Sequence, residues 1–445
     1  MKLPLLLIAL LSAFALWGAA RVPFHPDEST QLFTSADFDL LLTHPRALGW
    51  QPGRDEDLRQ RYRLLDAPLT RYLLGLGRTL AGQPPLPADW DWGKTWAENA
   101  AAGALPSPEL LRAGRMAVTA LLPLTLWLFY LTGYALGGRR GGLAGVLLLG
   151  LHPLVLLHAR RAMAEGALLF GVTFTLWALL AAPSRRRPGW LGLALGLAVN
   201  AKQSALALVP LAGVDGGQWT VDCGRGTTDG GRRTVDGGRW TRDDGLRSTV
   251  YRLPSVVCGL LSTVLVLLTL TALLNPVFWP HPVLAIRSAI HLRADLAARQ
   301  AADTARLAPE TLLDTPAKRL IALVGNLYLT PPRFAEVGNY TAETAAAEAA
   351  YLANPLHDWG RGLYGGALFL ALTLLGMGRG VREIWKGRTA FGEAQAARKV
   401  ACLLGATALQ GGALLLMIPL PWQRYVIPLL PMVVLWQAYA FKRVG

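Results

Sequence analysis

Two adjacent carboxylates follow the first apolar run of the chain, within residues 24–30. A carboxylate beside a partly desolvating membrane surface holds its proton more tightly than one in water, which suits it to act as a general base. Because neighbours in sequence point to different faces of a helix or strand, we expect only one of Asp27 and Glu28 to reach a substrate, while the other orients it. The alternative is a helix N-terminus with Asp27 as its cap after Pro26.

A second group of charges, Arg160, Arg161 and Glu165, lies where we expect a turn between two apolar runs. Arg161 and Glu165 are four residues apart, so an ion pair along one helix face is one interpretation. Arg160 would then be available for another role. Charges this close to hydrocarbon are costly unless they are paired or used, so a site for an anionic headgroup is the competing interpretation.

Two further cations, Lys202 and Arg424, lie at turns that we expect on the same side of the membrane. Lys202 could simply extend its charge from a helix end towards water. Trp422 and Tyr425, which flank Arg424, are typical of an interfacial aromatic belt. If Arg160, Lys202 and Arg424 converge, they form a cationic pocket suited to holding a phosphate through charge-assisted hydrogen bonds.

A proline-rich segment after residue 274 contains His281, which could assist at such a site, although a lone histidine near an interface is more often a bystander. Residues 284–299 place apolar side chains at helical spacing, which predicts an amphipathic helix in the membrane interface. The outer loops have no clustered carboxylates that demand a divalent metal, so we assign no metal and no cofactor, although a metal is compatible with the sequence.

The elements that must position these residues belong to a chain of 445 residues, of which 52% are hydrophobic and 16% charged. An average soluble protein is about 25% charged, so this chain lacks the polar surface of an aqueous globule. Apolar runs of about 20 residues recur, which predicts an all-α polytopic membrane protein. The net charge of +15 comes from basic residues in short segments between apolar runs, which indicates membrane orientation and excludes nucleic-acid binding.

The apolar runs predict about ten membrane-spanning helices. The first covers residues 3–20, and we favour a retained helix over a cleaved signal peptide because the run is longer than a usual signal core. The others are expected near residues 113–136, 143–159, 164–182, 189–201, 203–213, 253–274, 362–377, 400–418 and 424–441. With this count the short basic segments all fall on one side, which is cytoplasmic by the positive-inside rule.

Residues 1–445 are therefore expected to form a single membrane domain with two large loops on the non-cytoplasmic side, residues 21–112 and 276–361. A different kind of sequence covers residues 213–247, which consist of five units of seven residues. Glycine recurs in every unit and no apolar positions repeat as a coiled coil requires, so we predict a flexible cytoplasmic loop.

The order of four elements resembles the GT-C membrane glycosyltransferases, in particular the branch related to protein O-mannosyltransferases and aminoarabinose transferases. The four elements are the Asp27-Glu28 pair after the first helix, a Pro-Leu-x-x-Tyr-Leu-Leu segment at residues 68–74, the charged turn at residues 160–165 and a Trp-x-Arg-Tyr motif at residues 422–425. The match runs over most of the chain apart from the repeat, and the order of the motifs with the expected topology carries it.

The resemblance implies a helical bundle with two surface helices in the first loop and a cavity at the outer membrane face. It implies transfer of a sugar from a polyprenyl-phosphate donor, among membrane lipids, to a hydroxyl of a glycan, lipid or protein by an inverting single displacement. Asp27 would be the base and Glu28 would support it. Candidates to hold the donor phosphate are Arg160, Arg161, Lys202 and Arg424, and Glu165 stands where the family usually has Asp.

The alternative is a non-catalytic protein that binds or transports an isoprenoid-linked sugar with the same cationic pocket. A transporter needs acidic groups within its spans to couple ions, and Glu165 near a span end is the only candidate in the sequence. This favours the enzyme. The loop at residues 276–361 is too small for the soluble domain of the larger mannosyltransferases, so a lipid or glycan acceptor is as plausible as a protein.

Overall fold

The computed structural model describes residues 2–54, 57–213, 244–335, 340–387 and 394–442, with the backbone alone for residues 244–256. Within these ranges the chain is helical and has no strand, so the all-α prediction is confirmed for the described residues. Five helical segments are long and apolar enough to cross a membrane: α1 (Lys2–Ala19), Pro108–Gly150, Val257–Leu274, α17 (Gly362–Gly387) and α18 (Ala394–Met417).

The apolar segment Pro108–Gly150 contains α7 (Pro108–Thr119) and α8 (Leu122–Gly150), and α8 is interrupted by a sharp reversal. Gly138 at this reversal has φ +65°, a left-handed conformation that glycine adopts without strain. The backbones on either side then pack closely, since a Cβ on Gly133 would lie 2.9 Å from the carbonyl oxygen of Gly141. The expected basic turn at residues 139–140 therefore separates two antiparallel halves of α8.

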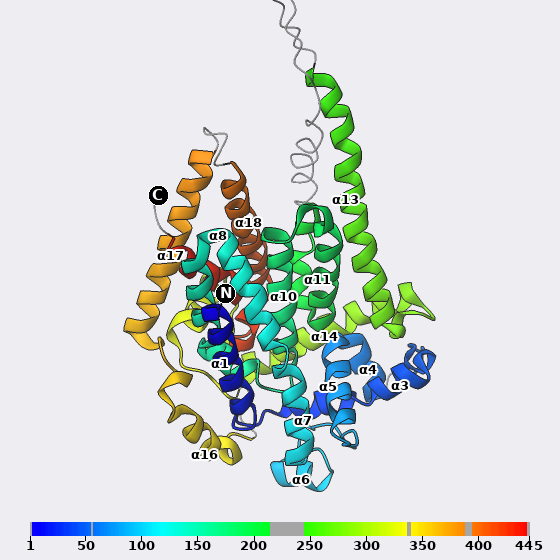
Figure 1. Ribbon diagram of the computed structural model, residues 1–445. Coiled ribbons are helices and arrows are strands. Elements are labelled where there is room, and N and C mark those ends of the chain that lie inside the picture. Colours follow the sequence, from blue (N-terminus) through cyan, green and yellow to red (C-terminus); the bar gives the residue numbers. More distant parts are fainter. Residues whose placement is uncertain (1, 55–56, 214–243, 336–339, 388–393, 443–445) are drawn as a thin grey trace, which may run out of the picture.

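The upright helices of the bundle lie side by side (Figure 1). Its inner members are α10 (Ala164–Leu180) and α11 (Arg187–Ala201), and the others are α1, α8, α13 (Asp244–Leu274), α17, α18 and α19 (Leu430–Tyr439). Almost every residue of α10 is buried, as expected for a helix that is apolar all round. Small residues allow close approach: a Cβ on Gly171 would lie 2.6 Å from the Cα of Ala198 on α11.

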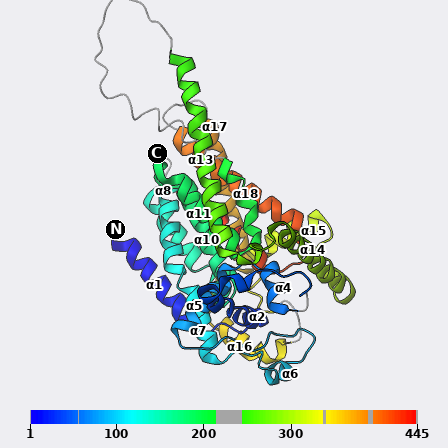
Figure 2. The ribbon, with the colours of Figure 1, turned by 90° about the vertical axis from the view of Figure 1, so that its right-hand side faces the viewer.

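The first predicted loop folds into short helices at one end of the bundle (Figures 1 and 2). They are α2 (Pro26–Thr34), α3 (Asp37–Thr43), α4 (Leu58–Leu65), α5 (Leu69–Leu80) and α6 (Trp96–Ala101), with the 3-10 turn η1 (Pro45–Leu48). The resemblance implied two surface helices, and five form because caps and prolines repeatedly end the helical runs. Buried Asp37 of α3 connects these helices, because its carboxylate accepts hydrogen bonds from Arg63 of α4 at 2.7 Å and from Arg71 of α5 at 3.0 Å.

The second predicted loop lies at the same end of the bundle as the first (Figures 1 and 2). It contains η4 (Pro276–Phe278), α14 (Pro282–Leu307), η5 (Pro309–Thr311), α15 (Pro316–Val324), the π-helical η6 (Gly325–Leu329), α16 (Thr341–Leu352) and η7 (Pro355–His357). The predicted helix at residues 284–299 is confirmed as part of α14. Ala285 packs against Trp50 and Leu64, whereas Ile286 and Ile290 are exposed.

Most of the predicted repeat loop lies outside the described residues.

Candidate functional site

Asp27 stands in the first turn of α2, beside the end of α1. The N-cap of α2 is His25, whose Nδ1 accepts from the backbone N–H of Asp27 at 3.1 Å, so the alternative in which Asp27 is the cap is wrong. The Asp27 carboxylate is thereby left for side-chain contacts. It accepts a hydrogen bond from Arg424 and is 28% exposed.

Glu28 points in another direction and is completely buried. Arg115 on α7 donates to its two oxygens at 2.8 and 2.7 Å, and the backbone N–H groups of His25 and Ala162 donate at 3.1 and 2.8 Å. These four hydrogen bonds join α2, α7 and the turn before α10. Glu28 therefore positions the segment that carries Asp27, and its carboxylate is fully occupied.

Glu165 and Lys202 form a second ion pair, with Lys202 Nζ 2.6 Å from Glu165 Oε1. Glu165 is buried in the first turn of α10, and Lys202 follows the last residue of α11. One interpretation of the sequence paired Arg161 with Glu165 along one helix, but the chain turns between α9 (Pro153–His158) and α10, so the two residues do not share a helix. Buried Arg161 donates instead to the carbonyls of Pro23 and Phe334 at 3.3 and 3.2 Å.

The segment before α19 brings Arg424 to the same place. Trp422 precedes the 3-10 turn η8 (Gln423–Val426), and its ring stacks on that of Tyr425 within the turn. The Arg424 guanidinium lies 4.8 Å from the Trp422 ring centroid. Lys202 Nζ lies 5.9 Å from the ring centroid of Tyr425. Two of the predicted phosphate-binding cations therefore lie close to this turn, and one of them, Arg424, contacts Asp27.

Arg160 does not join this group through the hydrogen bonds of its guanidinium. It donates to the carbonyl of Phe14 in α1 at 2.9 Å and contacts His357 in η7 at 3.2 Å. The side chain is fully buried, and a Cβ on Gly18 would lie 2.5 Å from its Cζ. Arg160 thus joins α1 to the second loop.

His281 also lies apart from the Asp27 group. It is exposed at the start of α14, where its ring makes an edge contact with Trp50 at 6.5 Å between centroids. Because Trp50 packs with Val277 and Ala285, this histidine belongs to the junction between the two outer loops.

Three residues near the group were not among the predicted site residues. Arg115 is the partner of Glu28, and a lone arginine within an apolar run was a signal that could have identified it. His158 is buried at the end of α9, and neither ring nitrogen has a hydrogen-bond partner within the described part of the chain. Asp89 accepts from the Tyr62 hydroxyl at 2.5 Å, and burial raises the pKa of its carboxyl.

The electrostatics keep the N-cap of α2 neutral. Burial lowers the pKa of His25 well below its usual value of 6.5, and the nearby positive charges of Arg161 and Arg424 lower it further. A neutral imidazole can accept from the Asp27 N–H, whereas a protonated one cannot. At neutral pH, His25 can therefore cap α2 without adding a positive charge next to Arg161 and Arg424.

An apolar cavity adjoins the Arg424 segment. It lies between α15, α18 and residues 420–426, and Leu323, Ile418 and Trp422 are among its walls. Arg319 also lines it, but this guanidinium donates to the carbonyls of Leu313, Leu415 and Leu416. The cavity therefore offers apolar surface beside the cationic residues.

Across the described ranges, no group of three or more His, Cys, Asp or Glu residues could hold a metal ion. The arrangement instead offers a partly exposed carboxylate, two cations and a buried histidine that has no hydrogen-bond partner among the described residues, at one end of a helical bundle. No protein-family model matches this chain, and a search of curated proteins finds no similar sequence.

Proposed function

We propose that this protein is an integral-membrane glycosyltransferase that uses a polyprenyl-phosphate sugar as donor and a hydroxyl group as acceptor. One observation carries the proposal: Asp27 and Arg424, which are 397 residues apart in sequence, meet in an ion pair, and Lys202 lies 5.9 Å from the ring centroid of Tyr425, the neighbour of Arg424. A base and phosphate-binding cations within one group are what the displacement of a sugar from a phosphate requires.

In the proposed reaction, the acceptor hydroxyl attacks the anomeric carbon and the bond from that carbon to the phosphate oxygen breaks. The hydroxyl proton passes to Asp27, and the polyprenyl phosphate leaves with the bonding electrons. Lys202 and Arg424 stabilise the charge that develops on the leaving phosphate. A single displacement of this kind inverts the anomeric centre.

The ion pair suggests how donor and base are coordinated. Arg424 binds Asp27 in the structure, so the carboxylate that would take the acceptor proton is occupied by the guanidinium. A donor phosphate competes for the same guanidinium through charge-assisted bonds of its own, which releases the carboxylate to take the acceptor proton. Glu28 contributes by holding α2 in place.

The apolar cavity next to Trp422 supports a lipid donor. A polyprenyl chain needs an apolar surface that begins at the phosphate site, and the walls formed by α15 and α18 supply one. A soluble nucleotide sugar has no apolar chain that would bind to this surface.

The membrane plan supports an active site on the non-cytoplasmic face of a cell membrane. We infer about ten spans: the five apolar segments, with α8 counted as two halves, and the shorter helices α10, α11, Gln203–Gly213 and α19. Arg379 on α17 donates to the carbonyl of Lys442, and Lys442 adjoins Gly137 beside the basic turn of α8. By the positive-inside rule this end is cytoplasmic, and the two loop regions lie opposite it.

The proposal is tested with the purified protein in liposomes and a panel of polyprenyl-phosphate monosaccharides. We expect Asp27→Asn to reduce transfer by roughly 10²- to 10⁴-fold while donor binding persists, because the amide can contact Arg424 but cannot take the proton. Asp39→Asn is the matched control, since Asp39 is also a partly exposed carboxylate of the first loop paired with an arginine, Arg78. Donor binding without turnover in any variant would reject the enzyme and leave a binding or transport protein.

The phosphate site is tested separately through donor affinity. Lys202→Met is combined with Glu165→Gln so that no buried carboxylate is left unpaired. We expect the double variant to bind the donor about 10- to 100-fold more weakly, because a hydrogen bond to a charged group contributes about 1.5–3 kcal/mol. Unchanged affinity would place the phosphate elsewhere.

A further inference from the structure

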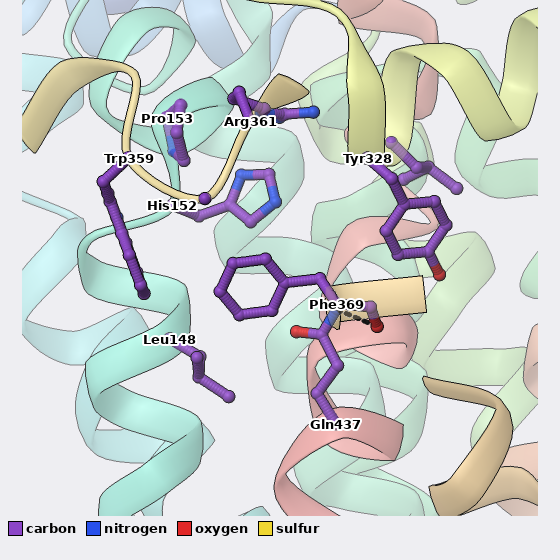
Figure 3. A pocket seen from close by; sticks show the side chains of 10 residues that line it. Leu148, His152, Pro153, Tyr328, Trp359, Arg361, Phe369 and Gln437 are labelled. Atoms are coloured by element: carbon purple, nitrogen blue, oxygen red, sulfur yellow. Dashed lines mark hydrogen bonds between the residues drawn. The ribbon is translucent and has the colours of Figure 1, made fainter. Parts of the chain in front are cut away.

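A second cavity, shown in Figure 3, lies away from the Asp27 group. Its walls come from the junction of α8 and α9, from η6, from the loop before α17, and from α17 and α19. Figure 3 shows the imidazole of His152 between Arg361 and the ring of Phe369, with Trp359 and Tyr328 on opposite sides.

Arg361 is the charged residue that lines this cavity. Its Nη1 donates to the carbonyl of Asn326 at 3.0 Å, while Nη2 is buried and has no hydrogen-bond partner within the described ranges. Asp358 is the acid whose charge acts on this guanidinium, but the described side chains of the two residues form no ion pair. A buried guanidinium N–H without an acceptor is costly, so an anion in the cavity would supply the hydrogen bond that the described residues do not give to Nη2.

The backbone around Arg361 is shaped to place it there. Gly360 has φ +72° and Gly362 has φ +75°, conformations that other residues rarely adopt. A Cβ on Gly360 would lie 2.1 Å from a ring carbon of Phe369, so the loop can approach the ring only with glycine at this position. The indole N–H of Trp359 donates to the carbonyl of Leu151, which anchors the loop on α8. Burial lowers the pKa of Arg361 to about 10, which leaves it charged at neutral pH.

His152 can supply a second donor. Its Nδ1 accepts from the backbone N–H of Leu154 at 3.3 Å, so in the neutral ring the proton resides on Nε2. The Tyr328 hydroxyl is already engaged with Thr373 Oγ1 at 3.0 Å. Arg361 and His152 are thus the groups that can recognise an anion here.

The surroundings favour a lipid over a free ion. The cavity lies beside the first turns of α17, where Leu363, Tyr364 and Leu368 are 72%, 89% and 58% exposed. In a membrane these side chains contact acyl chains. We propose that the cavity binds the phosphate headgroup of an anionic membrane lipid, with Arg361 as its ionic partner and His152 as a neutral donor.

The test measures binding of dioleoyl phosphatidylglycerol to the delipidated protein by native mass spectrometry. Diacylglycerol, which lacks the phosphate, and inorganic phosphate, which lacks the chains, are compared with it. We expect phosphatidylglycerol to bind the wild type and to bind Arg361→Gln about 10- to 100-fold more weakly. Arg306→Gln, which removes an exposed cation from α14 in the second loop, should bind as the wild type does.

Equal affinity of the wild type and Arg361→Gln would overturn the proposal, as would equally tight binding of diacylglycerol. Displacement of the lipid by inorganic phosphate at comparable concentrations would overturn its lipid component. If Arg361→Gln does not fold, a photoactivatable phosphatidylglycerol is crosslinked to the wild type. Adducts on Leu148, Leu327 or Phe369 are then expected, and their absence would reject the site.

Discussion

Arg115 of α7 and Glu28 of α2 form a two-pronged ion pair in which both side chains are buried, at 3% and 0% exposure. The same guanidinium donates to the carbonyls of Ala19 and Val22 at 3.2 and 2.7 Å. One arginine therefore joins the end of α1, the first turn of α2 and the helix that enters the bundle. The position of Asp27 depends on this junction.

We expect Glu28→Gln to lower the free energy of unfolding by about 3 kcal/mol, because it leaves Arg115 buried without its counter-charge. Glu98→Gln is the control. Glu98 occupies the same third position of a capping box, at α6, but it is exposed. Denaturation in detergent should show a large loss for the first variant and little change for the second. Equal effects would mean that the cap, and not the buried pair, stabilises α2.

Replacing Arg160 should affect stability without affecting donor binding. Its hydrogen bonds reach Phe14 and His357, and Arg160→Gln loses those contacts inside the protein. We expect the melting temperature to fall while the donor dissociation constant, measured below that temperature, stays within about twofold of the wild type. A weaker donor affinity with an unchanged melting temperature would instead indicate that Arg160 is part of the proposed phosphate site.

Stability should decrease as the pH falls below about 6.5, because His25 is held neutral in the folded chain but takes up a proton when the chain unfolds. The unfolded state binds more protons between pH 6.5 and the much lower folded pKa. Each such group contributes a slope of about 1.4 kcal/mol per pH unit in that window.

His25→Asn isolates this contribution, since Asn also caps a helix through its side-chain oxygen but does not titrate. Melting temperatures from pH 8 to pH 5 should fall less steeply for this variant than for the wild type. The buried His158 is unchanged in both proteins and provides the common background. Parallel curves would show that His25 is not protonated on unfolding.

Two glycines of α17 should respond oppositely to alanine. A Cβ on Gly376 would lie 1.9 Å from the carbonyl oxygen of Trp436 in α19, whereas no atom lies within 4 Å of one on Gly378. We expect Gly376→Ala to destabilise the protein by about 1–3 kcal/mol and Gly378→Ala to stabilise it by about 0.5–1 kcal/mol. Thermal unfolding compares the two, and equal responses would contradict the packing of α17 on α19.

Hydrophobicity and spacing alone determined the class of this protein and the outline of its helices. The apolar runs determine where the helical segments begin and end, and the paired glycines at residues 137–138 allow the chain to reverse. Hydrophobicity and backbone freedom both act over a few residues, so they can be recognised in the sequence. The helix within residues 284–299 was likewise predictable from its periodicity. The five surface helices of the first loop were not, since caps such as Asp57 work only when the following turn forms.

The partners of the charged side chains were decided by the tertiary structure. Spacing allowed an Arg161–Glu165 pair along one helix, yet Lys202 binds Glu165 because the chain turns after α9. Arg160 bonds to Phe14 and His357, while Arg424 pairs with a carboxylate 397 residues away. A long side chain takes whichever partner the packed helices bring within hydrogen-bond distance. That choice depends on contacts far apart in sequence, which no local pattern records.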